Sequence, residues 1–203
     1  MLLVSGATRT MARLGPSETL GRLFVPTQGD NLRTLADGWQ WAADNGCFTG
    51  LDVDAWIDML NELRGLPGCL FVVVPDKVAD AKTTLKMWQR WSPVVHAYGY
   101  PAAFVAQDGC QDVPASAAEL FIGGTTDYKL SREARDLVDF AHATGRWVHM
   151  GRVNTRKRMR IAASWGVDSI DGSKFSRWSE THLPTGIAWA RAEKAQPWLW
   201  RTA

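Results

Sequence analysis

Short apolar runs, separated by helical patterns, constrain the fold of this chain most strongly. Each run of apolar or β-branched residues is followed by small or polar residues. The eight runs are LLVSG (2–6), RLFVPTQG (22–29), WQWAADNG (39–46), CLFVVVPD (69–76), AAFVAQDG (102–109), ELFIGG (119–124), RWVHMG (146–151) and VDSIDG (167–172). Nearly continuous apolar strands are typical of parallel sheets that are covered by helices on both faces.

The segments between the later runs have the periodicity of amphipathic helices. In 52–65 the apolar residues recur at helical spacing, as Trp56, Met59, Leu60 and Leu63, and Gly65 ends the pattern. A second helix is expected in 80–99 and a third in 154–166, beginning at Asn154. A fourth is expected in 131–145, with Ser131 as the N-cap. Its inward residues should be Ala134, Leu137, Val138 and Phe140.

This alternation predicts a compact (β/α)8 barrel in which residues 1–203 form a single domain. The connections between the first three runs are too short or too rich in glycine for full helices, so irregular connections are expected there. The alternative is an open doubly wound sheet. That fold would call for a phosphate-binding G-x-G-x-x-G loop after the first strand, and SGATRTMARLG lacks this pattern.

Composition excludes several classes of protein. Hydrophobic residues make up 46% of the chain and charged residues 22%, as in ordinary globular proteins. We expect neither a membrane span nor a signal peptide, and we expect a cytoplasmic protein. The cysteines (Cys47, Cys69 and Cys110) are odd in number and widely spaced, so neither a disulfide framework nor a zinc site is expected. His149 is the only one of four histidines at a strand end, which argues against a catalytic metal.

Polar and glycine residues follow the apolar runs, where a parallel barrel places its catalytic residues. These are Asp44, Asp76, Gln107, Gly123, Gly124, His149, Gly151 and Asp171. Each has an ordinary interpretation. Asn45-Gly46 could form a hairpin turn, Asp76 could cap a helix, and His149 could be a packed core histidine. The glycine pair could be only a tight bend, and the remaining polar positions only turns. Their recurrence at successive strand ends favours a shared site.

The chemistry of such a set suits a guanine-like base. Carboxylates accept hydrogen bonds from the N1–H and exocyclic amine of guanine. The Gln107 amide and a glycine N–H could donate to its O6. A separate carboxylate could attack an anomeric carbon and form a covalent glycosyl intermediate.

Cations gather in the last third of the chain. Residues 146–160 contain six basic side chains and no acidic one. We expect a DNA-binding face made of Arg152, Arg156, Lys157, Arg158 and Arg160, extended by Lys174 and Arg177. A base inside a duplex cannot reach a barrel pocket, so it would have to be flipped out or already single-stranded.

The order of these motifs resembles the tRNA-guanine transglycosylase superfamily. ATRTMARLG…RLFVPTQGDNLRTL is similar to the opening segment of that family, and ADNGCF is similar to its D-S-G-G-F motif. VVVPDKVAD, FVAQDG and FIGGTTD resemble the segments that read the base. HMGRVNTRKRMRIAASWGVDSIDG resembles the segment that carries the nucleophile. The resemblance implies that Asp171 is the nucleophile and that Asp44 is an acid in contact with the base, and we assign Asp44 as the catalytic base that takes the N9 proton. It also implies that Asp76, Gln107, Gly123 and Gly124 contact the base, and we assign His149 and Gly151 to the same pocket.

The chain also departs from the tRNA-modifying enzymes. It is much shorter and lacks their zinc-binding cluster, Asn45 and Cys47 replace small residues, and Gly172-Ser173-Lys174 replaces a cysteine-bearing turn. It is therefore more similar to the DNA-modifying, DpdA-type branch of phages and bacterial genomic islands. That branch implies exchange of guanine in DNA for a 7-deazaguanine derivative, without a cofactor. The expected setting is the cytoplasm of a bacterial or phage-infected cell. We expect a monomer, and a partner protein could open the DNA.

Three other functions fit the sequence. Water could replace the incoming base, which would make the protein a DNA or nucleoside glycosylase. The chain could be an accessory DNA-binding module with an idle barrel. It could also be a metal-dependent barrel hydrolase.

Overall fold

The computed structural model describes residues 1–6, 9–26 and 31–195, and its parallel strands form a closed barrel in sequence order. The strands are β1 (Leu2–Ser5), β2 (Leu20–Phe24), β3 (Trp41–Ala43), β4 (Cys69–Val73), β5 (Ala102–Ala106), β6 (Glu119–Ile122), β7 (Trp147–Met150) and β8 (Ser169–Asp171). β1 pairs with both β2 and β8, which closes the ring. The predicted (β/α)8 barrel is therefore confirmed, and the open sheet is excluded.

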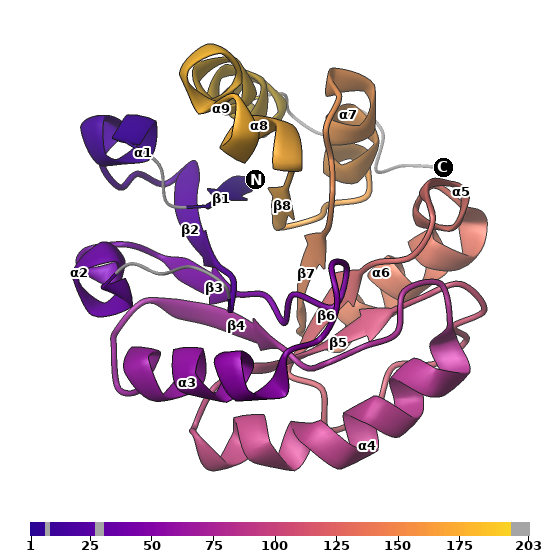
Figure 1. Cartoon of the computed structure of the whole chain (residues 1–203). Helices are drawn as coiled ribbons and strands as arrows, with labels where there is room; N and C mark the ends of the chain where they lie inside the picture. Colours follow the sequence, from indigo (N-terminus) through magenta and orange to yellow (C-terminus); the bar gives the residue numbers. More distant parts are fainter. Residues whose placement is uncertain (7–8, 27–30, 196–203) are drawn as a thin grey trace.

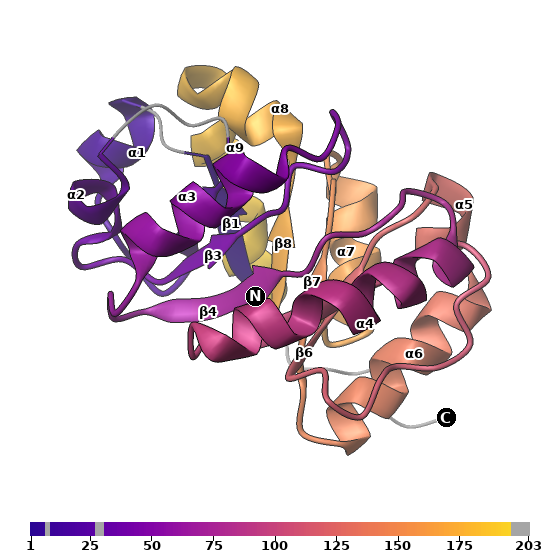
Figure 2. The same cartoon turned by 60° about the horizontal axis from the view of Figure 1, so that its bottom comes forward.

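Helices surround the strands. They are α1 (Arg9–Leu14), α2 (Leu32–Ala36), α3 (Val53–Leu63), α4 (Ala81–Ala97), α5 (Thr126–Lys129), α6 (Arg132–Ala143), α7 (Arg156–Ser164), α8 (Ser173–Arg177) and α9 (Ser179–Ala195). In Figure 1 the sequence colours pass once around the ring, from α1 and α2 on the left to α8 and α9 at the top. Figure 2 shows α4 and α6 running along the outside of the same barrel.

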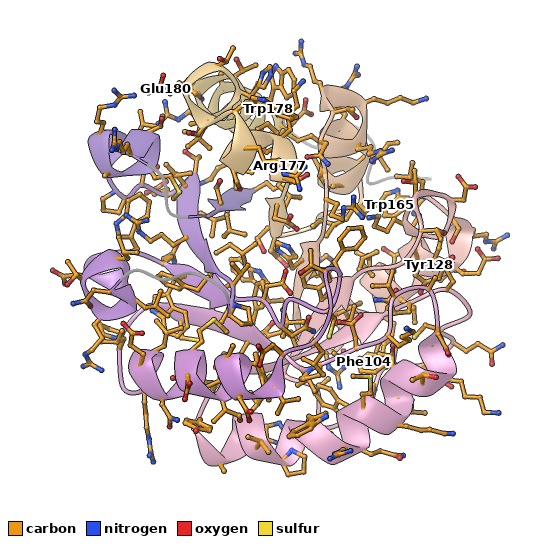
Figure 3. The ribbon with its side chains drawn as sticks, viewed as in Figure 1. Phe104, Tyr128, Trp165, Arg177, Trp178 and Glu180 are labelled. Carbon is orange, nitrogen blue, oxygen red and sulfur yellow. The ribbon has the colours of Figure 1, made fainter. Side chains whose placement is uncertain are left out.

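The core has two parts, because successive residues of a strand face opposite sides of the sheet. One apolar cluster fills the barrel and includes Val73, Val105 and Phe121. The larger cluster lies between the strands and the helices. Phe104 of β5, for example, packs edge-on against Trp88 of α4 at 5.5 Å between ring centroids, and Figure 3 shows it between these elements.

The first connections are short, as the sequence predicts. α1 has six residues and α2 has five, whereas α4 has 17. The connection between β5 and β6, residues 107–118, contains no helix. Part of the family-like opening segment, residues 7–8 and 27–30, lies outside the described residues.

Two details of the predicted helices are wrong. Phe140 is 46% exposed, and Ala141 is buried in its place. Ala141 follows Leu137 by four positions and Val138 by three, so it shares their face of the helix. The helix expected to begin at Asn154 begins after it, with Thr155 as the N-cap accepting from the Arg158 N–H.

Among the described residues, no helix is both long and apolar enough to cross a bilayer.

Candidate active site

All but one of the residues predicted at the strand ends line one pocket at the carboxyl ends of the strands. Eight of the predicted residues line it: Asp44, Asp76, Gln107, Gly123, Gly124, Gly151, Arg152 and Asp171. Seven further residues complete its wall: Asn45, Phe48, Val73, Val78, Val105, Phe121 and Lys129. Val73, Val105 and Phe121 belong to the apolar filling of the barrel, so the pocket has an apolar floor below a polar rim.

Asp44 lies directly after β3 and does not belong to a hairpin. β3 and β4 are parallel, and α3 lies between them in sequence, so Asn45-Gly46 opens a long crossover connection. The Asn45 N–H donates to Asp44 Oδ1 at 2.7 Å. Burial, reinforced by the charges of Asp171 and Asp76, raises the pKa of Asp44 to about 7. Asp44 can therefore both release and accept a proton near neutral pH.

Asp76 is held by two buried amides. Asn45 Nδ2 donates to Asp76 Oδ1 at 2.7 Å, and Gln107 Nε2 donates to Asp76 Oδ2 at 2.5 Å. Burial raises the pKa of Asp76 above its ordinary value, although hydrogen bonds from both amides act in the opposite direction. Asp80, not Asp76, caps the following helix. The sequence analysis missed the role of Asn45, which also donates to the Val74 carbonyl and is 1% exposed.

The glycine pair after β6 permits close approach to Gln107. A Cβ at Gly123 would lie 2.9 Å from Gln107 Nε2 and 2.6 Å from a methyl carbon of Val105. Gly124 has φ +78°, and a Cβ there would meet the Asp108 carboxylate. The Gly124 N–H has no hydrogen-bond acceptor within the described chain.

Asp171 ends β8 and accepts two hydrogen bonds on one oxygen. Its Oδ1 lies 3.2 Å from His149 Nε2 and 3.0 Å from the Arg152 backbone nitrogen. The Val153 N–H also donates to the Asp171 carbonyl at 2.6 Å. The loop after β7 thus fixes both the backbone and the carboxylate of Asp171.

His149 does not line the pocket, contrary to the substrate contact expected for it. It is 1% exposed and lies against Phe121, with 4.6 Å between ring centroids. The Asp171 carboxylate can only accept, so His149 Nε2 carries a proton and donates it to Asp171. On the other side of the ring, His149 Nδ1 lies 2.9 Å from Ser169 Oγ, which accepts a hydrogen bond from Trp147 Nε1. His149 is therefore a packed histidine that positions the carboxylate.

Backbone strain also marks the pocket. Ala79 has φ 61° and Arg152 has φ 59°, and no other non-glycine residue of the described chain has positive φ. The Ala79 N–H donates to Gln107 Oε1 at 2.8 Å, which directs the amide nitrogen of Gln107 toward Asp76. The Arg152 N–H donates to Asp171. Each strained residue thus orients one polar side chain of the pocket, and such strain is typical of functional sites.

Two side chains meet across the mouth of the pocket. Phe48 comes from the loop after β3 and is 61% exposed. The Arg152 guanidinium comes from the loop after β7 and lies 3.8 Å from the centroid of the Phe48 ring. β3 and β7 are four strands apart in an eight-stranded ring, so this contact spans the opening. The sequence offered no signal for Phe48 beyond its place after a strand end.

Lys129 is the pocket residue that the sequence analysis missed altogether. It ends α5 and is 6% exposed. Burial lowers its pKa to about 8, and the charges of Arg152 and Arg158 act in the same direction, while Asp171 opposes them. Its neighbour Tyr128, labelled in Figure 3, is also buried and belongs to the same short helix.

The cations expected to bind DNA are distributed over several elements. Arg152 lines the pocket, whereas three others lie in a separate surface hollow along α7: Arg156, Lys157 and Arg160. Arg177, labelled in Figure 3, belongs to α8 and is exposed, and Lys174 of the same helix is half-buried. The Lys174 N–H donates to Asn154 Oδ1 at 3.0 Å, which ties α8 to the loop before α7.

The acids of the pocket do not form a metal-binding cluster. Within the part of the chain that the structure describes, no group of three or more histidine, cysteine, aspartate or glutamate side chains could hold a metal ion.

Comparisons with known proteins support the barrel fold and do not identify a family or a function. No protein-family model matches the sequence, and no curated protein matches it. The solved structure of native KDPGal is similar, with a TM-score of 0.50 at 12% identity, over 96% of this chain and 93% of that one. A structure of the Bacillus subtilis YkuI protein, with an EAL domain, c-di-GMP and calcium, matches at TM-score 0.35 and 10% identity, over 90% of this chain and 47% of that one. The chain is thus a (β/α)8 barrel with a polar pocket at the carboxyl ends of its strands.

Proposed function

We propose that the protein is a DNA-guanine transglycosylase that exchanges guanine in DNA for a 7-deazaguanine derivative through a covalent intermediate on Asp171. The observation that carries the proposal is the convergence of Asp44, Asp76, Gln107, both glycines and Asp171 on one pocket. The resemblance to the transglycosylase superfamily rests on these same residues.

The wall formed by the ends of β3 to β6 has the hydrogen-bonding groups that a guanine edge needs. Each oxygen of Asp76 accepts one amide hydrogen bond and retains a lone pair for the N1–H or the exocyclic amine of the base. The Gly124 N–H is available for O6. One face of the exposed Phe48 ring carries the Arg152 guanidinium, and the opposite face is the one on which a base can stack.

The first half-reaction breaks the bond between C1′ and guanine. The Asp171 carboxylate attacks C1′ and forms an ester, while guanine leaves with the electrons of the broken bond. Protonated Asp44 supplies the proton that guanine requires. The raised pKa of Asp44 keeps this proton in place near neutral pH.

The second half-reaction regenerates the protein. The incoming 7-deazaguanine occupies the same pocket and gives its N9 proton to the Asp44 carboxylate. Its N9 then attacks C1′ and releases Asp171 as a carboxylate. Protons and electrons balance over the two steps, because Asp44 donates one proton and recovers one. The exchange requires no further energy source.

A base-exchange assay tests the proposal. A single-stranded oligonucleotide with one isotopically labelled guanine is incubated with the protein and 7-cyano-7-deazaguanine, and its nucleosides are analysed by mass spectrometry. We expect the deazaguanine nucleoside to appear, and an alkali-sensitive DNA–protein ester to form when the second base is omitted.

Matched variants assign the chemistry. Asp171→Asn should give neither exchange nor ester, whereas Asp58→Asn, on the exposed face of α3, should give both. Guanine release with abasic DNA in the absence of added base would indicate a glycosylase instead. Exchange by Asp171→Asn at the wild-type rate would refute the proposed nucleophile.

A further inference from the structure

Lys129 is an unusual charged residue in this protein. Its side chain lines the pocket, yet the residue is only 6% exposed. Within the described chain, its Nζ has neither a hydrogen bond nor an ion pair. The stem of this side chain is buried, and its ammonium has no protein partner where the side chain meets the pocket, so a ligand in the pocket would complete it.

The surroundings of Lys129 indicate the charge of this ligand. Arg152 and Arg158 are the cations whose charges affect Lys129 most strongly, and neither forms an ion pair with a described residue. The carboxylate with the largest effect is Asp171, which already accepts two hydrogen bonds. Asp108 acts more weakly and also accepts two hydrogen bonds of its own. The three cations therefore lie beside carboxylates that already accept hydrogen bonds from other groups, and this arrangement favours an anionic ligand.

We propose that Lys129, with Arg152 and Arg158, binds a backbone phosphate of the nucleotide whose C1′ faces Asp171. This inference rests on the proposed function for the identity of the nucleotide. A nucleotide positioned with C1′ at Asp171 carries a phosphodiester on each side of its sugar. The cations lie on the same side of the pocket as Asp171, so one of these phosphodiesters is the anion within reach.

The position of Lys129 argues against a role in reading the base. Asp44 and Asp76 face the other half of the pocket, and Lys129 is not among the charges with the largest effects on either carboxylate. An ammonium with a pKa of about 8 is mostly charged at neutral pH, as phosphate binding requires.

Binding of oligonucleotides with one neutral linkage tests the inference directly. Three single-stranded oligonucleotides carry one guanine each. One has normal linkages, one has a methylphosphonate on the 5′ side of that guanine, and one has it on the 3′ side. Dissociation constants are measured by fluorescence anisotropy without any free base. For the wild type, we expect one of the two substitutions to weaken binding about tenfold or more, as for loss of a charged hydrogen bond.

Lys129→Met should bind the normal oligonucleotide more weakly than the wild type does. The methylphosphonate that weakens wild-type binding should cause no further loss of affinity in this variant. Lys129→Gln serves as a second variant, and circular dichroism checks that both are folded. Lys157 lies on the exposed surface of α7. Lys157→Met should bind all three oligonucleotides more weakly to the same extent, and the methylphosphonate that weakens binding to the wild type should still weaken binding to this variant.

The outcomes separate this inference from the proposed function. A linkage effect that Lys129→Met removes supports the phosphate site, whether or not base exchange occurs. A linkage effect of wild-type size in Lys129→Met overturns the role of Lys129 and leaves the exchange reaction untouched. Equal binding of all three oligonucleotides by the wild type also overturns it.

Discussion

The two halves of the pocket differ in how their charges are arranged. In the half built from β3 to β5, which we call the acidic half, Asp44 and Asp76 lie near buried amides, and burial raises the pKa of both. In the half built from β6 to β8, which we call the cationic half, Asp171 lies near Lys129 and Arg152, and burial lowers the pKa of Lys129. The first arrangement suits a neutral ligand rich in N–H donors, and the second suits a negatively charged one. One barrel mouth thus provides two environments, which a nucleotide with a neutral base and an anionic backbone could occupy together.

The strongest test of this comparison is Asp171→Asn. The amide oxygen of asparagine can still accept from His149 and the Arg152 N–H, so the fold should persist. The substitution removes the proposed nucleophile, and we expect the rate of ester formation to fall by about 10³-fold or more. Single-turnover gel analysis measures this rate. A loss of less than about tenfold would contradict covalent catalysis at this position.

The pH dependence of stability tests the acidic half. The folded-state pKa of Asp44, about 7, exceeds its ordinary value of 3.8, so the folded protein retains a proton that the unfolded chain releases between these pH values. Stability should therefore fall as pH rises from about 4 to about 7, by at most about 4 kcal/mol from this group. Asp44→Asn should remove this fall and exceed the wild type at about pH 8, as measured by urea unfolding. Parallel stability curves for the two proteins would contradict the raised pKa.

Lys129→Met should show the opposite pH trend. The folded-state pKa of Lys129, about 8, lies below its ordinary value of 10.5, so the folded protein bears the cost of the charge fully below pH 8. That cost is about 3 kcal/mol at neutral pH and disappears as the unfolded chain also loses its proton. We expect the variant to be more stable than the wild type at neutral pH, with a difference that shrinks as pH rises. Urea unfolding at neutral and alkaline pH measures it. A variant destabilised at neutral pH would mean that Lys129 has a protein partner.

The smallest expected effect concerns backbone strain in the acidic half. Ala79 has φ 61°, a conformation that glycine adopts without strain. Ala79→Gly retains the N–H that donates to Gln107. Relief of the strain should outweigh the greater freedom of the unfolded chain, and we expect stabilisation by about 0.5–1 kcal/mol. Thermal unfolding of the variant measures the change.

The matched control for this substitution is Ala188→Gly. Ala188 is exposed within α9, so the same change removes a methyl group from ordinary helical backbone. This variant should be destabilised by about 1 kcal/mol, because glycine lowers helix stability. Destabilisation of both variants to the same extent would show that the Ala79 backbone is not strained.

Much of the barrel could be predicted from the sequence. The eight apolar runs and their alternation with helices reflect a local pattern that burial imposes on every strand. The strand-end positions of Asp44, Asp76, Gln107 and Asp171 followed from the same pattern. Closure of a parallel barrel in sequence order then brings these ends together.

The partners of the site residues could not be predicted in this way. Asn45 stood out only as a turn residue, yet its amide holds Asp76 across 31 positions of sequence. His149 was assigned to the substrate, yet its side chain points to Asp171 and Ser169 inside the barrel. Lys129 had no distinctive signal, because it lies in the mostly polar segment TTDYKLSR, seven positions after the end of β6.

The sequence by itself determined where the strands end and which chemical groups stand there, because hydrophobic periodicity is a local property of the chain. Only the tertiary structure decided which groups touch, which protons are held and which charges lack partners. Hydrogen bonds, burial and electrostatic interactions depend on distances between segments that are remote in sequence. The acidic half and the cationic half of the pocket arise from those distances.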